Sequence, residues 1–113
     1  MVYEASSIDY RRNAAQHIYK RLPERIYKGK LPPHLKAVVV VDILINPAGQ
    51  VDQIHWVRLP KYAPEVKQEI EQAIYQSAPF PAPSPLQRVS YTDTWLWHKS
   101  GRFQLDTLTE GQH

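Results

Sequence analysis

The 113-residue chain contains no cysteine, and this absence excludes disulfide cross-links, cysteine-ligated zinc sites and thiol nucleophiles. It has no apolar run near the roughly 18 residues that a membrane-spanning helix needs, and no charged-then-apolar signal segment opens it. Its 4 glycines are isolated, so a glycine-rich phosphate-binding loop is also excluded. We therefore expect a soluble piece without a cofactor, which could have been cut from a longer anchored protein.

What the chain does contain is the composition of one small globular domain. Hydrophobic residues make up 42% and charged residues 22%, which is ordinary for a folded protein. A chain of this length builds one core, so we expect a single domain over residues 1–113, with its core within about 9–108 and a frayed tail at 109–113. Proline is enriched, at 10 of 113 residues, and it marks the boundaries of the predicted elements.

Positive charge is concentrated in the first third of the chain. Residues 1–36 hold eight Lys and Arg against three Asp and Glu, although the net charge of the whole chain is only +3. A basic first helix with interleaved tyrosines is one pattern of a nucleic-acid-binding domain, and this is our alternative hypothesis. We favour a solvated helix face without nucleic acid, because the charge excess is modest and no nucleic-acid-binding motif accompanies it.

The first half of the chain predicts a helix followed by a hairpin. Apolar residues recur at helical spacing over residues 8–26, and Pro23 should end or kink this helix near Arg21. After a connector at 28–36, residues 37–45 form an apolar, β-branched run typical of a central strand. The segment 46–49 (Asn-Pro-Ala-Gly) is a tight turn, and residues 50–59 form the return strand, with a bulge.

The second half predicts a helix, a connector and another strand. Pro64 suits the first position of a four-turn amphipathic helix that Pro79 ends. Alternating prolines over 79–85 predict an extended strap. Residues 88–98 alternate between apolar and polar side chains, as in a strand with one solvent-exposed face. Residues 102–108 predict a short further strand or strand extension.

These elements predict an α+β fold. The three main strands need a partner for their apolar face, and the two amphipathic helices are the candidates. We therefore expect a two-layer sandwich of a three-stranded antiparallel sheet and two helices, in the order α-β-β-α-β, with 102–108 as a short fourth strand if it pairs.

Side-chain sets that support catalysis or metal binding are missing from the sequence. The five histidines are scattered without metal-ligand spacing, and no Gly-x-Ser-x-Gly nucleophile motif occurs. Asp42 and Asp52 flank the hairpin turn and could couple as an acid pair, but ordinary exposed strand carboxylates are the favoured interpretation. We therefore predict neither an enzyme nor a metal site.

The strand at 88–98 is the predicted functional element. The edge of a sheet exposes backbone N–H and C=O groups that can pair with an extended segment of another protein. Trp95 and Trp97 are expected to lie in the core. The prediction of partner binding therefore depends on the backbone of the strand and on its solvent-exposed face, which carries Ser90, Thr92 and Thr94. The predicted partner-binding residues are Arg88, Val89, Ser90, Tyr91, Thr92, Asp93, Thr94, Trp95 and Leu96.

The order of these motifs resembles the TonB/TolA C-terminal domain family. The resemblance covers about residues 9–108: the valine-rich strand, the turn 46–49 with Gln-Val-Asp after it, the amphipathic helix, and Pro-Phe-Pro-Ala-Pro at 79–83. The long first helix and the Ala-Pro-Phe-Pro-Ala-Pro segment look more like TolA, and the Tyr-Pro pair usual in TonB domains does not occur.

The resemblance implies a non-enzymatic periplasmic domain of a Gram-negative envelope protein, tethered to the inner membrane by an N-terminal helix. Such domains link an inner-membrane motor to an outer-membrane receptor or a periplasmic protein, and they engage an extended peptide segment of that partner at the edge of the final strand. That strand corresponds to residues 88–98 here. A strand at 102–108 would cover this edge, and pairing of two copies through a sheet edge is a further expectation.

Overall fold

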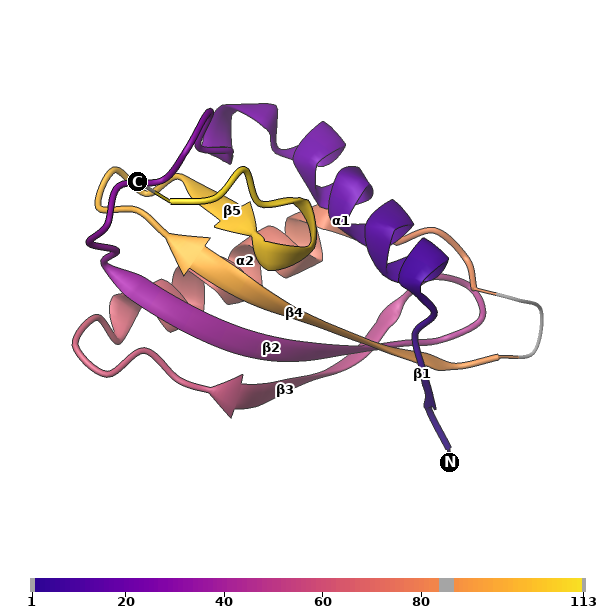
Figure 1. Ribbon diagram of the computed structural model, residues 1–113. Helices are drawn as coiled ribbons and strands as arrows, with labels where there is room; N and C mark the ends of the chain where they lie inside the picture. The colour runs from indigo at the N-terminus through magenta and orange to yellow at the C-terminus, as the bar shows by residue number, and fades with distance from the viewer. Residues whose placement is uncertain (1, 84–86, 113) are drawn as a thin grey trace.

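The computed structural model describes residues 2–83 and 87–112 and shows an α+β fold (Figure 1). Its sheet has five strands and is mixed, so the prediction of a purely antiparallel sheet was wrong. The short strand expected within 102–108 does form, at residues 103–105. The elements, in chain order, are β1 (Glu4–Ala5), α1 (Ile8–Arg21), the 3₁₀ turn η1 (Pro23–Arg25), β2 (Ala37–Ile45), β3 (Val51–Arg58), α2 (Glu65–Ser77), β4 (Val89–Trp97), β5 (Phe103–Leu105) and the 3₁₀ turn η2 (Asp106–Leu108).

Helix α1 begins and ends where the sequence predicts. The Ser7 hydroxyl caps it by accepting a hydrogen bond of 3.0 Å from the Tyr10 N–H. Its last residue is Arg21, and Pro23 opens η1, because proline cannot continue the helical hydrogen bonds. The apolar face buries Ala14, Ala15 and Ile18.

The hairpin of β2 and β3 is closed by the predicted turn. The Asn46 side-chain carbonyl accepts hydrogen bonds from the N–H groups of Ala48 and Gln50, and Gly49 takes a φ of 87°. The predicted bulge is confirmed, and it has a counterpart: the pairing register shifts at both ends of the hairpin, between Val40 and Val41 and between Leu44 and Ile45.

The proline-rich strap lies against the hairpin turn. The Phe80 N–H donates a hydrogen bond of 2.8 Å to the Gly49 carbonyl, and the Phe80 side chain is buried in the core. Residues 78–83 form no helix or strand, as predicted, whereas Ser84 and Pro85 of the predicted strap lie outside the described residues.

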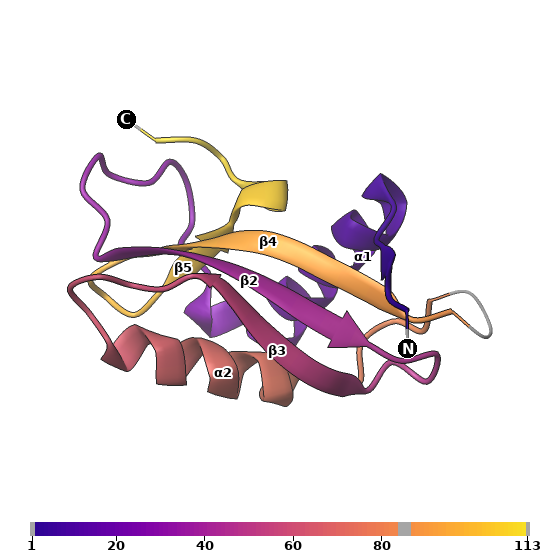
Figure 2. The same cartoon turned by 90° about the horizontal axis from the view of Figure 1, so that it is seen from below.

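Both helices cover the same face of the sheet, and the main core lies between these two layers (Figure 2). Alternate residues of β2 and β4 are buried against α1 and α2, in agreement with the predicted two-layer arrangement. Along the path of the sheet the order is β1-β4-β2-β3, and β5 also pairs with β4. Within the described residues, no helix is long and apolar enough to cross a membrane.

Residues 109–112 are not the frayed tail that their polar sequence predicted. The Leu31 N–H donates a hydrogen bond of 2.8 Å to the Gly111 carbonyl, and the Gln112 side chain donates to the Pro32 carbonyl. The buried Gln104 amide also contributes, because it accepts from the Thr109 hydroxyl and the Glu110 N–H. These polar partners compensate for the small apolar area of the segment.

Candidate functional site

Of the predicted partner-binding residues, Val89 to Leu96 lie on β4 and Arg88 directly precedes it. The two faces of β4 differ as expected. Odd-numbered residues from Val89 to Trp97 are buried toward the helices, and Trp95 and Trp97 are 0% exposed. Both tryptophans are therefore core residues, as favoured from the sequence. The opposite face of β4 carries half-buried or exposed side chains: Ser90, Thr92, Thr94 and Leu96.

The backbone groups of even-numbered β4 residues point away from β2. The Ser90 carbonyl accepts from the Ser6 N–H, and the His98 N–H donates to the Arg102 carbonyl, both on the far side from β2. Because pairing direction alternates along a strand, Thr92 and Thr94 face the same way. A partner strand would bind these groups.

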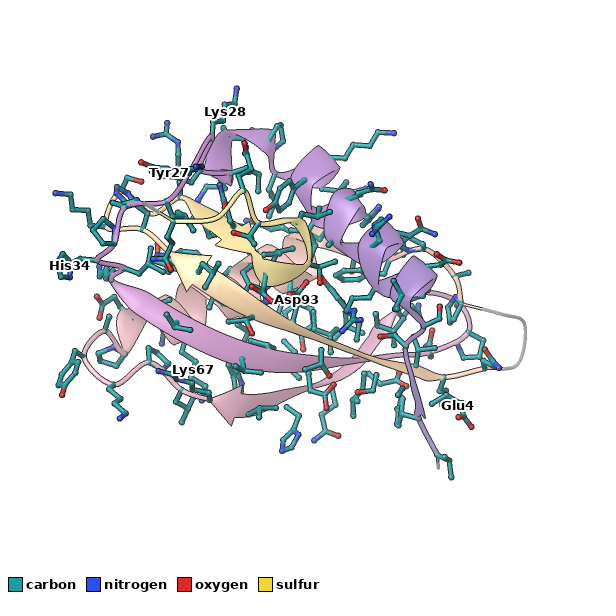
Figure 3. The ribbon with its side chains drawn as sticks, in the orientation of Figure 1. Glu4, Tyr27, Lys28, His34, Lys67 and Asp93 are labelled. Atoms are coloured by element: carbon teal, nitrogen blue, oxygen red, sulfur yellow. The ribbon has the colours of Figure 1, made fainter. Side chains whose placement is uncertain are left out.

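The start of the β4 edge is occupied by β1, which the sequence did not predict. Strand β1 runs parallel to β4, with Glu4 opposite Val89 and Ala5 opposite Ser90. Its backbone hydrogen bonds include one from the Glu4 N–H to the Arg88 carbonyl at 2.8 Å and one from the Ser6 N–H to the Ser90 carbonyl at 3.1 Å. The side chains of both β1 residues are exposed, and Glu4 points away from the fold (Figure 3).

The end of the same edge is occupied by β5, which is firmly packed. Leu96 pairs with Gln104, so the backbone edge of Leu96, one of the predicted partner-binding residues, is already covered. The Phe103 ring stacks on Trp97 at a centroid distance of 5.2 Å and lies 4.7 Å from Trp95. Phe103 and Leu105 are 0% exposed, which makes β5 part of the core.

Between these two coverings, Asp93 lies at the junction of β4, α1 and η2 (Figure 3). Its Oδ1 accepts from the Thr94 N–H at 2.9 Å and from the Thr107 N–H at 3.1 Å, and its Oδ2 accepts from the Tyr91 hydroxyl at 2.6 Å. Burial raises the pKa of the Asp93 carboxyl, although these hydrogen bonds oppose the increase. Burial also raises the pKa of Tyr91, with a further contribution from the Asp93 charge.

A groove of about 550 Å³ lies beside β1. Its walls come from β1, from the first turns of α1 and from the strap: Glu4, Ala5, Ser7, Tyr10, Asn13, Ala82, Pro83, Gln87 and Val89. The Tyr10 hydroxyl donates a hydrogen bond of 2.8 Å to the Pro81 carbonyl, which fixes the strap to α1, and burial raises the pKa of Tyr10 to about 12. One side of the groove is therefore formed by α1 and the strap, which this hydrogen bond joins, and the other side by β1.

The two carboxylates that flank the hairpin turn do not form an acid pair. Asp42 lies opposite His55 and accepts hydrogen bonds from the hydroxyls of Ser90 and Thr92. Asp52 instead accepts from the Tyr3 hydroxyl at 2.7 Å. No group of three or more metal-ligating side chains is found in residues 2–83 and 87–112.

Two basic side chains of residues 1–36, Arg25 and Lys36, make contacts with other parts of the protein. The Arg25 guanidinium donates to the Gly101 carbonyl, lies 5.4 Å from the centroid of the Trp97 ring and is 3.6 Å from a Glu69 carboxylate oxygen. Lys36 forms an ion pair of 3.0 Å with Glu65. These two cations have structural contacts that their sequence positions did not predict.

No family model, curated protein or solved structure matches this chain. The resemblance to TonB/TolA C-terminal domains therefore depends on the sequence motifs and their order. The partner, the compartment and the role that it implies stay predictions.

Proposed function

We propose that this chain is a non-enzymatic, periplasmic interaction domain of the TonB/TolA type. It binds an extended segment of an outer-membrane receptor or periplasmic protein by strand addition at the β4 edge. An N-terminal region anchored in the inner membrane couples this contact to a motor. The observation that carries the proposal is β1, an extended segment of the chain itself that pairs with β4 at Val89 and Ser90.

Strand β1 supports the proposal because it is attached so lightly. It pairs with β4 over only two residues, the Tyr3 hydroxyl contacts Asp52, and its own side chains are exposed. Each backbone hydrogen bond contributes about 0.5–1.5 kcal/mol net, so a partner that pairs over more residues can displace it. Backbone pairing of this kind gives affinity with little demand on the partner's side chains.

The coverage of β4 narrows the proposed site to its first half. A displaced β1 frees Arg88 to Ser90, and the partner can extend to Thr92, because the Thr94 N–H is already bonded to the Asp93 carboxylate beside η2. Trp95 and Leu96 are thereby excluded from backbone pairing with the partner. The groove between α1 and the strap lies along the freed part and can receive side chains of the added segment.

The proposal is tested with a variant in which β1 cannot hold its place. Ser6→Pro removes the N–H that donates to the Ser90 carbonyl, whereas Ala5→Pro, the matched control, leaves both donors of β1 in place. We expect a TonB-box-like or TolB-derived peptide to bind Ser6→Pro more tightly than Ala5→Pro, with NMR shift changes along Arg88 to Thr94.

A second substitution shows whether the bound peptide uses the β4 backbone. Thr92→Pro, added to Ser6→Pro, removes a donor that faces the edge and leaves the pairing with β2 in place. Loss of peptide binding in a folded double variant is expected. Normal binding by that variant, or shift changes confined to α1, would contradict strand addition. Steep weakening of binding by salt would favour the nucleic-acid alternative instead.

A further inference from the structure

The sheet has a second edge, formed by β3, and no other described segment covers it. Strand β3 pairs only with β2, whereas the far side of β4 carries β1 and β5. In Figure 1, β3 runs along the lower border of the sheet, and Figure 2 shows α2 beneath it. Unpaired strand edges are places where another chain can add, so this edge needs a partner or protection.

In the regularly paired stretch 53–56 of this strand, the free backbone groups belong to Ile54 and Trp56. Odd-numbered residues of β2 bond with β4, so even-numbered residues such as Asp42 bond with β3. Asp42 lies opposite His55, which therefore faces β2. Its neighbours in sequence direct their N–H and C=O groups outward.

The edge is short and charged at its ends. Register shifts leave only residues 53–56 in regular pairing with β2, and Asp52 and Arg58 lie at the two ends of this stretch. Bulges and terminal charges usually discourage a foreign strand. Here the charges have opposite signs and are each three residues from His55.

We propose that β3 pairs in antiparallel fashion with β3 of a second copy of this chain, with the two His55 residues meeting on the twofold axis. In this register Ile54 of each copy bonds with Trp56 of the other, which uses every outward backbone group of residues 53–56. Asp52 of each copy lies opposite Arg58 of the other. The end charges that repel other strands therefore attract a twofold-related copy.

The side of α2 next to β3 also carries charges of both signs, which the proposed twofold axis would bring together in opposite pairs. The Lys67 Nζ lies 5.4 Å from the centroid of the Trp56 ring, which places this flank of α2 beside β3 (Figure 3). Glu71 follows one helical turn later on the same flank. A twofold axis through β3 sets the two α2 helices antiparallel, so that Lys67 of each copy is directed toward Glu71 of the other.

The absence of cysteine allows a direct test in the full chain. At a non-hydrogen-bonded antiparallel pair, two Cα atoms are about 4.5 Å apart, which is within disulfide range. His55→Cys should therefore form a covalent dimer under mild oxidation. Gln53→Cys is the matched control, because both side chains are exposed on the same strand but Gln53 lies opposite Val57 of the second copy. Equal cross-linking of the two variants would overturn the proposal.

Charge reversal gives a test without oxidation. In sedimentation velocity we expect the unmodified chain to show a concentration-dependent dimer that Arg58→Glu weakens several-fold. Adding Asp52→Arg should restore it, whereas Lys61→Glu, outside the strand, should have little effect. A chain that sediments as a monomer at every concentration, or a double variant without rescue, would show that the edge has another occupant or none.

Discussion

The backbone N–H of Thr107 donates a hydrogen bond of 3.1 Å to Oδ1 of Asp93, and this contact joins the C-terminal turn η2 to the middle of β4. The same oxygen accepts from the Thr94 N–H, one of the groups directed at the sheet edge. A single buried carboxylate therefore holds η2 in place and occupies an edge donor that a partner strand would use.

Asp93 should make the stability of the domain depend on pH in a predictable direction. Burial raises the pKa of this carboxyl in the folded state, so the folded domain binds the proton more tightly than the unfolded chain does. The resulting stabilisation is complete below the unfolded pKa of about 3.9 and is lost as pH rises through the folded value. We expect urea unfolding of Asp93→Asn to lack this component.

The test compares the free energy of unfolding of the unmodified chain with that of Asp93→Asn. The unfolding free energy of the unmodified chain minus that of Asp93→Asn should fall as pH rises through the window above about 3.9. Tyr91→Phe removes a hydrogen bond that lowers the pKa of Asp93, so it should move the window to higher pH. A pH-independent difference would show that Asp93 titrates alike in both states.

Gly49 should be intolerant of a side chain for two separable reasons. Its φ of +87° disfavours any Cβ, and a Cβ built there would overlap the Phe80 carbonyl oxygen of the strap. Gly101 has the same φ but no atom within 4 Å of such a Cβ. We expect Gly49→Ala to cost about 2–4 kcal/mol of unfolding free energy and Gly101→Ala about 1–2. Equal losses in thermal or urea unfolding would mean that the strap does not approach the turn closely.

The two coverings of β4 should differ in their contribution to stability. Phe103→Ala removes a fully buried ring that stacks on Trp97, and the expected cost is about 3–5 kcal/mol. Ser6→Pro in β1 removes one backbone hydrogen bond, worth about 0.5–1.5 kcal/mol. Urea unfolding measures both. If the costs were similar, β5 would be as detachable as β1, and the proposed site would extend to Leu96.

Much of the fold was predictable because its signals are local. Pro23 ends α1, the turn at 46–49 closes the hairpin, and the alternation of β4 predicts which side chains are buried. Strand β1 was missed because two exposed residues carry no periodic pattern. The order of residues 109–112 was missed because it depends on Gln104 and on carbonyl groups far away in the sequence.

The sequence by itself determined the two helices, the three long strands, the absence of thiol chemistry and the strand with one solvent-exposed face, since each follows from residue type and short-range spacing. Only the tertiary structure decided which edges of the sheet are covered. It placed β1 and β5 on β4, left the outer edge of β3 uncovered by any other segment among the described residues, and gave Asp93 a partner 14 residues away. The physical reason is that sheet edges are completed by backbone hydrogen bonds, which any residue can supply and which no sequence pattern therefore records.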